Sequence, residues 1–160
     1  MKVIEIYTDG AARGNPGRGG YGVILKYKQQ YKELSDGFRL TTNNRMELLA
    51  CIIGLEAIKA QNMDITIFSD SKYVVDSVVK GWVFSWIKKN NFGGKKNQDL
   101  WLRFLKVYTN HQVKFIWIKG HNEHPENERC DLLATSAADG NNLKIDTYYE
   151  NLSDTPKGLF

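Results

Sequence analysis

The segment Lys119–Asp131 holds the densest group of potential metal ligands in the chain. Its sequence, KGHNEHPENERCD, contains two of the three histidines, one of the two cysteines and four carboxylates. Zinc takes histidine, cysteine and carboxylate ligands, so His121, His124, Cys130 and Asp131 raise the hypothesis of a zinc site. The local spacing does not decide the matter, because ligands from distant parts of a chain can reach the same place.

Three further carboxylates, Asp9, Glu47 and Asp70, stand where predicted elements begin or end. Asp9 follows a β-branched run, Glu47 lies in the first turn of a predicted helix, and Asp70 follows a short apolar run. If these three meet Asp131, the four carboxylates repel one another and raise one another's pKa, so the cluster is costly unless cations occupy it. Oxygen ligands of this kind favour a hard ion, magnesium or manganese, over zinc.

The elements that must position these carboxylates follow from hydrophobic periodicity. Strand-like runs over residues 3–8, 20–28 and 31–41 open the chain, and a helical pattern follows over residues 44–61. A last helix is predicted from about residue 127 to 139. Between them we expect a strand, three helices and another strand, over residues 65–69, 71–81, 83–90, 98–109 and 113–118. The order βββαβαααβα predicts a mixed sheet with helices packed on it.

Strand directions place the carboxylates at one edge of that sheet. Strands joined by hairpins alternate in direction, so the first and third strands end at the same edge. Right-handed crossovers make strands 65–69 and 113–118 parallel to the first. All four carboxylates and His121 then lie at this edge. If strand 65–69 adjoins the first strand, about 4.8 Å separates their backbones, close enough for Asp9 and Asp70 to hold a common ion.

Each carboxylate also has a purely structural interpretation. Asp9 could be a turn residue, and Asp70 could cap the helix that follows it. Glu47 could close a capping box with Asn44, and Asp131 could complement the positive end of the last helix. These interpretations explain the residues one at a time, but they do not explain why all four project to one edge.

Length and composition limit the class of protein. The 160 residues, 42% hydrophobic and 25% charged, predict one globular domain, which we place at residues 1–140 with a polar tail at residues 141–160. No apolar run approaches the about 18 residues that cross a bilayer, so we expect no membrane association. The N-terminal segment is unlike a signal peptide, and two cysteines without framework spacing suit a reducing compartment. A cytoplasmic location is therefore expected.

Basic residues gather between Lys80 and Lys106. Seven stand there against one carboxylate, Asp99, so this segment has a net charge of +6, and the rest of the chain, whose total is +4, has −2. Such a segment favours a polyanionic partner, with a solvated helical surface as the alternative. Trp101 and Phe104, at helical spacing, are predicted to belong to the core.

The glycines Gly17, Gly19 and Gly22 spell GxGxxG. The motif opens a strand and not a helix, so it does not indicate a dinucleotide site. We expect these glycines to form the turn between the first two strands, with Asn15 and Pro16 shaping it.

Four stretches, YTDGAARGNPGRGGYG, TTNNRMELLA, SDSKYV and GHNEHPENERCD, resemble type 1 ribonuclease H in their order and spacing. The resemblance covers roughly residues 3–140. It implies an α/β, ribonuclease H-like fold with a five-stranded mixed sheet of order 3-2-1-4-5, strand two antiparallel, and helices on both faces. It also implies cleavage of the RNA strand of an RNA–DNA hybrid, leaving a 5′-phosphate and a 3′-hydroxyl.

The resemblance further implies site residues and cofactors. Two magnesium ions, which manganese can replace, would bind a quartet in which Asp9 bridges both ions, completed by Glu47, Asp70 and Asp131. His121 would carry a proton or assist product release, while His124 and Cys130 are expected to be structural. Nucleic-acid contacts are expected from the minor-groove asparagines, a phosphate-binding pair, a lysine beside Asp70 and the basic segment, namely Asn15, Asn43, Asn44, Thr42, Asn97, Lys72, Trp82, Trp86, Lys88 and Lys89.

Turn and capping chemistry stays open as the alternative for the asparagines and for the phosphate-binding pair. A hybrid-binding module without catalysis would be expected to lack at least one of the four carboxylates, so their presence favours an enzyme. Another nuclease of the same fold is disfavoured by the TNNRMEL and HPENERCD stretches. We expect the enzyme to be a monomer.

Overall fold

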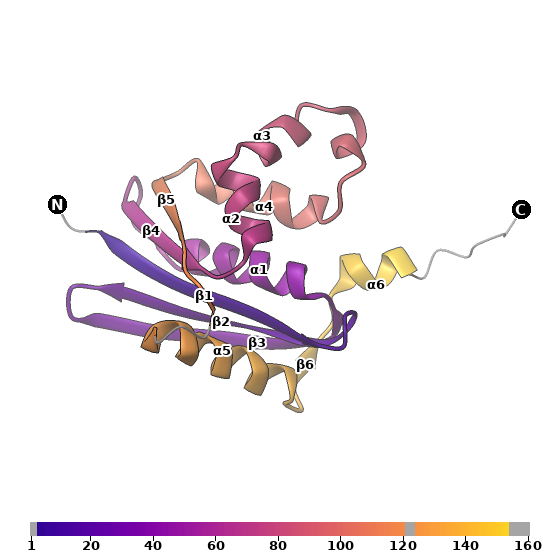
Figure 1. The fold of residues 1–160 in the computed structure, drawn as a ribbon, viewed down its shortest axis with the longest axis horizontal. Coiled ribbons are helices and arrows are strands. Elements are labelled where there is room, and N and C mark those ends of the chain that lie inside the picture. The colour runs from indigo at the N-terminus through magenta and orange to yellow at the C-terminus, as the bar shows by residue number, and fades with distance from the viewer. Residues whose placement is uncertain (1–2, 121–123, 154–160) are drawn as a thin grey trace, which may run out of the picture.

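A mixed sheet of six strands in the order β5-β4-β1-β2-β3-β6 forms the centre of the computed structural model, which describes residues 3–120 and 124–153 (Figure 1). The pairs β1–β2 and β2–β3 are antiparallel, while β4 is parallel to both β1 and β5. The strands span Ile4–Arg13, Gly17–Tyr27, Gln30–Thr41, Asp64–Ser69, Gln112–Trp117 and Leu143–Lys144, for β1 to β6. The predicted order of five strands is confirmed, and β6, which pairs with β3 in parallel, is an addition that the sequence analysis missed.

Helices cover both faces of the sheet. Helix α5 crosses β2, β1 and β3 on one face, whereas α1 packs on β1 and β2 from the other, with α4 behind it (Figure 1). The helical elements are α1 (Asn43–Glu56), α2 (Lys72–Val79), α3 (Trp82–Trp86), η1 (Asn90–Gly94), α4 (Gln98–Tyr108), α5 (Pro125–Ala138) and α6 (Thr147–Ser153). No helix in the described part of the chain is long and apolar enough to cross a membrane.

Several predicted boundaries were wrong. Helix α1 ends at Glu56, five residues before the predicted end, and the first strand continues past Thr8 to Arg13. The predicted helix 83–90 divides into α3 and the short segment η1, because Asn91, Phe92 and Gly93 have positive φ and interrupt the helical backbone.

The hydrophobic core lies between the sheet and the α1 side. Trp101 and Phe104 are fully buried there, with ring centroids 5.5 Å apart, so their prediction as core residues is confirmed. Phe92, expected among the aromatic residues of the basic segment, is also buried, at 3% exposure. Truncating a buried aromatic residue of this kind costs about 3–5 kcal/mol.

The glycine-rich stretch does not form the turn that was predicted for it. Gly17 begins β2, and Gly19 and Gly22 lie within that strand. A Cβ atom at Gly22 would overlap the carbonyl oxygen of Cys130 on α5. Glycine is therefore required where α5 crosses the strand closely, and this close crossing holds α5, which carries Asp131, against β1 and β2.

The predicted polar tail contains β6 and α6, which are joined to the rest of the molecule through a buried arginine. Arg45 of α1, at 2% exposure, donates to Asp146 at 2.7 Å and to Asp99 at 2.7 Å. The Thr41 hydroxyl also donates to Asp146, at 2.7 Å. Removing one partner of a buried ion pair costs about 3–5 kcal/mol. The segment is thus anchored, while the division of the chain at residue 140 stays a prediction.

Candidate active site

Asp9 and Asp70 are brought together by the parallel pairing of β1 with β4. The last paired residues are Thr8 and Ser69, so the two aspartates follow side by side at the same edge of the sheet. This confirms the inference that the two strands adjoin. Asp9 lies within β1, opposite Gly22 of β2, and is 6% exposed, so it is not a turn residue.

Glu47 reaches the same edge from α1. The N-cap of α1 is Thr42, whose hydroxyl accepts a hydrogen bond from the Arg45 N–H at 3.2 Å, so the capping box between Asn44 and Glu47 was wrong. A Cβ atom at Gly10 would overlap the backbone nitrogen of Glu47. Because residue 10 is glycine, the helix can lie against β1 directly beside Asp9.

The structural interpretation of Asp70 was also wrong. The N-cap of α2 is Ser71, whose hydroxyl accepts from the Val74 N–H at 3.2 Å. Asp70 precedes the cap, and its backbone carbonyl accepts a hydrogen bond from the indole nitrogen of Trp117 at 3.1 Å. The pairing of β1 with β4 and this indole contact from β5 therefore fix where Asp70 begins its turn toward α2.

Asp9, Glu47 and Asp70 form a compact acid triad, in which one carboxylate oxygen of each lies within 4.8 Å of those of the other two. It is the one group of three or more potential ligands of this kind among the described residues. Burial, followed by the charges of Asp70 and Glu47, raises the pKa of Asp9 to about 9. Burial raises the pKa of Glu47 to about 7, although a hydrogen bond from Ser71 opposes the rise. Divalent cations would relieve this unfavourable crowding.

Asp131 lies near the acid triad but outside that group of oxygens. It is half-buried on α5, and its charge makes a smaller contribution to the raised pKa of Asp9. The first turn of α5 contains Glu126 and Glu128, so Asp131 lies too far along the helix to be one of its first-turn carboxylates. Its role as a metal ligand stays a prediction.

The zinc hypothesis finds no ligand group in the described part of the chain. Cys130 is fully buried, and its thiol donates to the Tyr7 carbonyl at 3.3 Å. Burial raises the pKa of this thiol above its usual range, which disfavours the thiolate that zinc requires. His124 occupies the N-cap position of α5. His121, predicted as the proton carrier, lies outside the described residues.

A groove of about 870 Å³ gathers four of the predicted nucleic-acid contacts, Asn15, Thr42, Asn44 and Asn97. Asn97 has a left-handed backbone with φ of 65°, and its side chain is held from two sides. Its amide nitrogen donates to the Tyr73 hydroxyl at 3.0 Å, and its amide oxygen accepts from Arg45 at 3.3 Å. The Asn15 side chain accepts from the backbone N–H of Asn43 at 3.2 Å, so the turn chemistry proposed as an alternative is present too.

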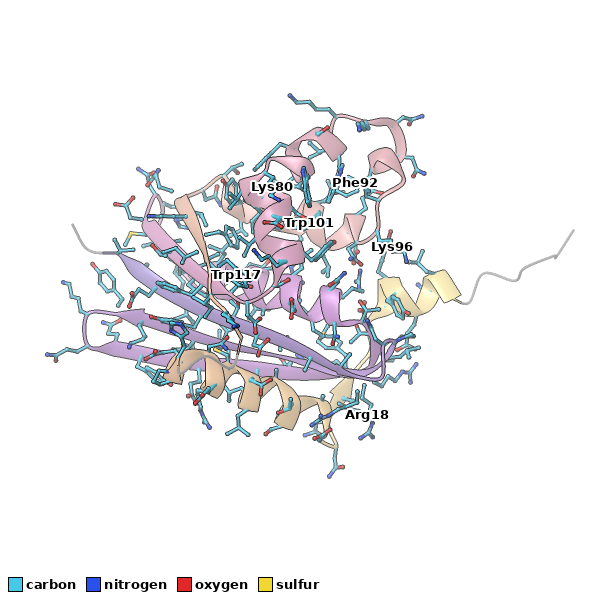
Figure 2. All side chains as sticks on the ribbon, in the orientation of Figure 1. Arg18, Lys80, Phe92, Lys96, Trp101 and Trp117 are labelled. Atoms are coloured by element: carbon cyan, nitrogen blue, oxygen red, sulfur yellow. The ribbon has the colours of Figure 1, made fainter. Side chains whose placement is uncertain are left out.

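The remaining walls of the groove come from the basic segment and from α6. They comprise Lys95, Lys96, Tyr148, Tyr149 and Leu152, together with Pro16. Figure 2 shows Lys96 on the side of the helical region that faces α6. The three α6 residues were missed because the sequence around them has no recognisable motif.

The basic segment presents its lysines to solvent and keeps most of its aromatic rings inside. Lys88 and Lys89 are exposed, as are Lys95 and Lys96. Trp82 is 43% exposed, whereas Trp86 is half-buried and packs edge-on against Trp101, with ring centroids 6.2 Å apart. The lysines and Trp82 can therefore meet a ligand directly, while Trp86 also supports the core.

An exposed tryptophan adjoins the acid triad and was not predicted. Trp117 ends β5 and is 40% exposed, and the Lys72 ammonium lies 4.0 Å from the centre of its ring (Figure 2). Lys72 was expected to contact nucleic acid, and the indole now gives it a fixed position beside Asp70. The signal for Trp117 was its place at the end of a strand that reaches the same edge.

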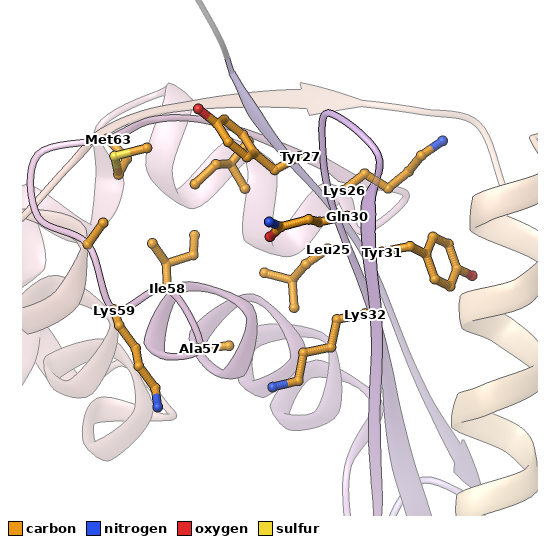
Figure 3. Close-up of a pocket in the computed structure, with 12 residues that line it drawn as sticks. Leu25, Lys26, Tyr27, Gln30, Tyr31, Lys32, Ala57, Ile58, Lys59 and Met63 are labelled. Atoms are coloured by element: carbon orange, nitrogen blue, oxygen red, sulfur yellow. The ribbon is translucent and has the colours of Figure 1, made fainter.

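A pocket of about 590 Å³ at the other end of the sheet is distinct from the acid triad (Figure 3). It lies between the β2–β3 hairpin and the segment after α1, with Leu25, Ile58 and Met63 among its apolar walls. Lys26, beside this pocket, pairs with Glu5 near the start of β1, whereas Asp9 lies four residues further along that strand. None of the residues that line the pocket is a carboxylate.

Comparisons with known proteins agree with this geometry. The sequence model of the RNase H family matches residues 1–139. The chain is 54% identical to Ribonuclease H of Desulforamulus reducens, over 91% of this chain and 94% of that protein. It is 50% identical to Ribonuclease HI of Shewanella oneidensis, over 94% of this chain and 96% of that protein.

Solved structures give the same result for the fold. LC9-RNase H1, described as a type 1 RNase H with the type 2 active-site motif, superposes with a TM-score of 0.78 and 27% identity, over 96% of this chain and 82% of that one. LC11-RNase H1 in complex with RNA/DNA hybrid gives 0.68 and 27%, over 85% and 96%. Because the match spans the strands and helices that carry all four carboxylates, the chain belongs to the RNase H family.

Proposed function

We propose that this protein is an endonuclease that hydrolyses the RNA strand of RNA–DNA hybrids with two magnesium ions, leaving a 5′-phosphate and a 3′-hydroxyl. The observation that carries the proposal is the buried acid triad, whose oxygens lie within 4.8 Å of one another. Membership of the RNase H family supports the reaction. The hybrid bound to LC11-RNase H1 supports the substrate.

The donor set fits hard divalent ions. It consists of carboxylate oxygens, and their burial and mutual repulsion raise the pKa of Asp9 to about 9, a strain that bound cations remove. We propose that Asp9, Glu47, Asp70 and Asp131 hold two magnesium ions, which manganese can replace. When bound, the ions supply activation of the attacking water and stabilisation of the departing oxygen, so no side-chain nucleophile is required.

The chain's own groups orient the ligands and move the proton. The Gly10 N–H donates to Asp9 at 2.8 Å, and Ser71 hydrogen-bonds Glu47, so both carboxylates are held before any ion arrives. Such fixed ligands need little rearrangement when the reaction takes place. We propose that His121 carries a proton to the departing oxygen or assists release of the product, a role that adds about 10²-fold or more to the rate.

The groove would place the hybrid relative to the acid triad. Thr42 and Glu47 are five residues apart on α1, so about 7.5 Å along the helix axis separates the groove from the acids. In this proposal Thr42 and Asn97 hold a phosphate of the DNA strand. Asn15, Asn43 and Asn44 approach the minor groove, where ribose 2′-hydroxyls distinguish the RNA strand. Exposed lysines of the basic segment add affinity through counterion release.

A cleavage assay on three duplexes tests the proposal. End-labelled RNA–DNA hybrid, duplex DNA and duplex RNA are incubated with the full chain, with and without magnesium. We expect internal cleavage of the RNA strand of the hybrid alone, only with the ion, and product ends that a phosphatase or a ligase identifies as 5′-phosphate and 3′-hydroxyl. Cleavage of the other duplexes at equal rate, or in chelator, would refute it. The cytoplasmic location and the monomeric state stay predictions.

A further inference from the structure

The groove beside the acid triad has one wall that lies beyond the matched family region. The family model ends at residue 139, whereas Tyr148, Tyr149 and Leu152 of α6 line the groove together with Thr42 and Asn97. Helix α6 stands next to the start of α1 and the β1–β2 turn, which supply the facing wall (Figure 1). The helix therefore lies where a ligand of that groove must pass.

Helix α6 is held in this position by buried and partly buried charge pairs. Asp146, immediately before the helix, accepts from Arg45 at 2.7 Å, and the Arg45 guanidinium also donates to Asn97 at 3.3 Å. Glu150 within α6 pairs with Arg39 of β3 at 2.8 Å. One arginine thus positions both α6 and a groove asparagine, so that the two walls keep a fixed separation.

The chemistry of the groove fits a sugar–phosphate backbone. Its lining includes two exposed lysines, Lys95 and Lys96, with hydroxyl and amide groups and no carboxylate. Lysine, asparagine, threonine and tyrosine side chains are the usual donors to phosphate oxygens. Aromatic and apolar side chains beside such donors pack against the sugars and bases of a nucleic-acid strand.

We propose that α6 extends the nucleic-acid-binding surface, with Tyr149 and Leu152 contacting the DNA strand of the hybrid next to the phosphate assigned to Thr42 and Asn97. The inference rests on the proposed hybrid substrate. Tyr148 has a different part, because its ring lies over the Arg45 guanidinium, with 5.4 Å from the central carbon to the ring centre. It secures the helix, whereas Tyr149 and Leu152 meet the strand.

A pair of charge substitutions at Leu152 tests the contact without threatening the fold, since this side chain is 59% exposed. In the full chain at about 0.15 M salt, where charges act over about 8 Å, Leu152→Glu should raise KM about threefold to tenfold. Leu152→Lys should lower KM and steepen its salt dependence by about 0.9. The turnover number should stay unchanged. The matched control is Asn151, an exposed neighbour on α6 that does not line the groove, where the same two substitutions should change KM less than about twofold.

Neutral methylphosphonate linkages assign the contact to a strand. Placed one at a time along the DNA strand, they should abolish the difference in KM between Leu152→Glu and Leu152→Lys at the contacted linkage. The same replacement in the RNA strand, away from the cleaved bond, should leave the difference intact. Tyr149→Ala should raise KM with unchanged turnover, and Tyr149→Phe provides a second variant if alanine prevents folding.

Three results would overturn the inference. Equal effects at Leu152 and Asn151 would show that α6 acts only through its general charge. Dependence on the RNA strand would place the helix on the wrong partner. A parent enzyme that cleaves the hybrid while the Leu152 variants keep its KM would remove α6 from the substrate surface and leave the proposed function standing, whereas a parent that cleaves no hybrid would refute both.

Discussion

Replacing Asp9 by asparagine should stabilise the protein in chelator while abolishing its activity. The pKa of Asp9 is raised from 3.8 to about 9 in the folded chain, so between these values the folded state keeps a proton that the unfolded state releases. Stability falls with rising pH wherever the folded state binds more protons. The parent should therefore lose stability from about pH 4 to about pH 9, and Asp9→Asn, which has no such proton, should not.

The size of the effect follows from the same shift. The interval from 3.8 to pH 7 is 3.2 units, and at about 1.36 kcal/mol per unit it corresponds to about 4 kcal/mol. Movement of Glu47 and Asp70 and entry of water relieve part of the crowding, so we expect Asp9→Asn to be more stable than the parent by about 2–4 kcal/mol at pH 7. For a chain of this length, that gain raises Tm by about 5–15 °C.

Thermal and urea unfolding of both proteins in chelator, from pH 4 to pH 9, measures this difference. It should be small at pH 4 and should widen with pH. Adding magnesium should narrow it, because the ions bind the ionised carboxylate of the folded parent. Glu128→Gln, an exposed carboxylate on α5, is the control and should follow the parent at every pH. A difference that is independent of pH, or an Asp9→Asn protein less stable than the parent at pH 8, would refute the electrostatic account of the acid triad.

Three other predictions concern the acids, the basic segment and the C-terminal anchor. Asp70→Asn should abolish cleavage but bind labelled hybrid within about threefold of the parent, and near-normal turnover would contradict the two-ion proposal. Asp146→Ala leaves the buried Arg45 without one partner and should cost about 3–5 kcal/mol in urea unfolding; a cost below about 1 kcal/mol would show that β6 and α6 are not anchored by this pair. A fourfold alanine variant of the exposed lysines should raise KM with little change in turnover and should flatten its salt dependence by about 0.9 or less for each phosphate that the variant no longer neutralises, whereas an unchanged KM and salt slope would make the segment an ordinary solvated surface; the residues are Lys88, Lys89, Lys95 and Lys96.

Much of the fold could be predicted because its signals are local and repeat along the chain. Alternation and chain direction were enough for the strand order from β5 to β3, and helical spacing placed Trp101 in the core. Strand β6 has only two residues and depends on Asp146 reaching Arg45, about a hundred positions away, so no local pattern announces it. The end of α1 at Glu56 was missed for a similar reason, because the residues beyond it keep a helical composition.

The acid triad could be predicted because strand direction alone brings its members to one edge. What the sequence could not give is their depth: Asp9 is 6% exposed because α1 and α5 both lie close to β1 and β2, and this closeness depends on Gly10 and Gly22. Trp117 and the α6 side of the groove were missed because each acquires its place only from interactions between distant segments.

The burial of Asp9 links the stability of the fold to its affinity for ions. Gly10 lets α1 approach β1, and this approach removes water from the carboxylates and raises the pKa of Asp9 and of Glu47. The same crowding that destabilises the ion-free protein is relieved when divalent cations bind, so the missing stability reappears as binding free energy. A larger residue at position 10 would move α1 away from Asp9. It should therefore weaken ion binding and reduce the pH dependence of stability together, since both arise from the distance between one helix and one strand.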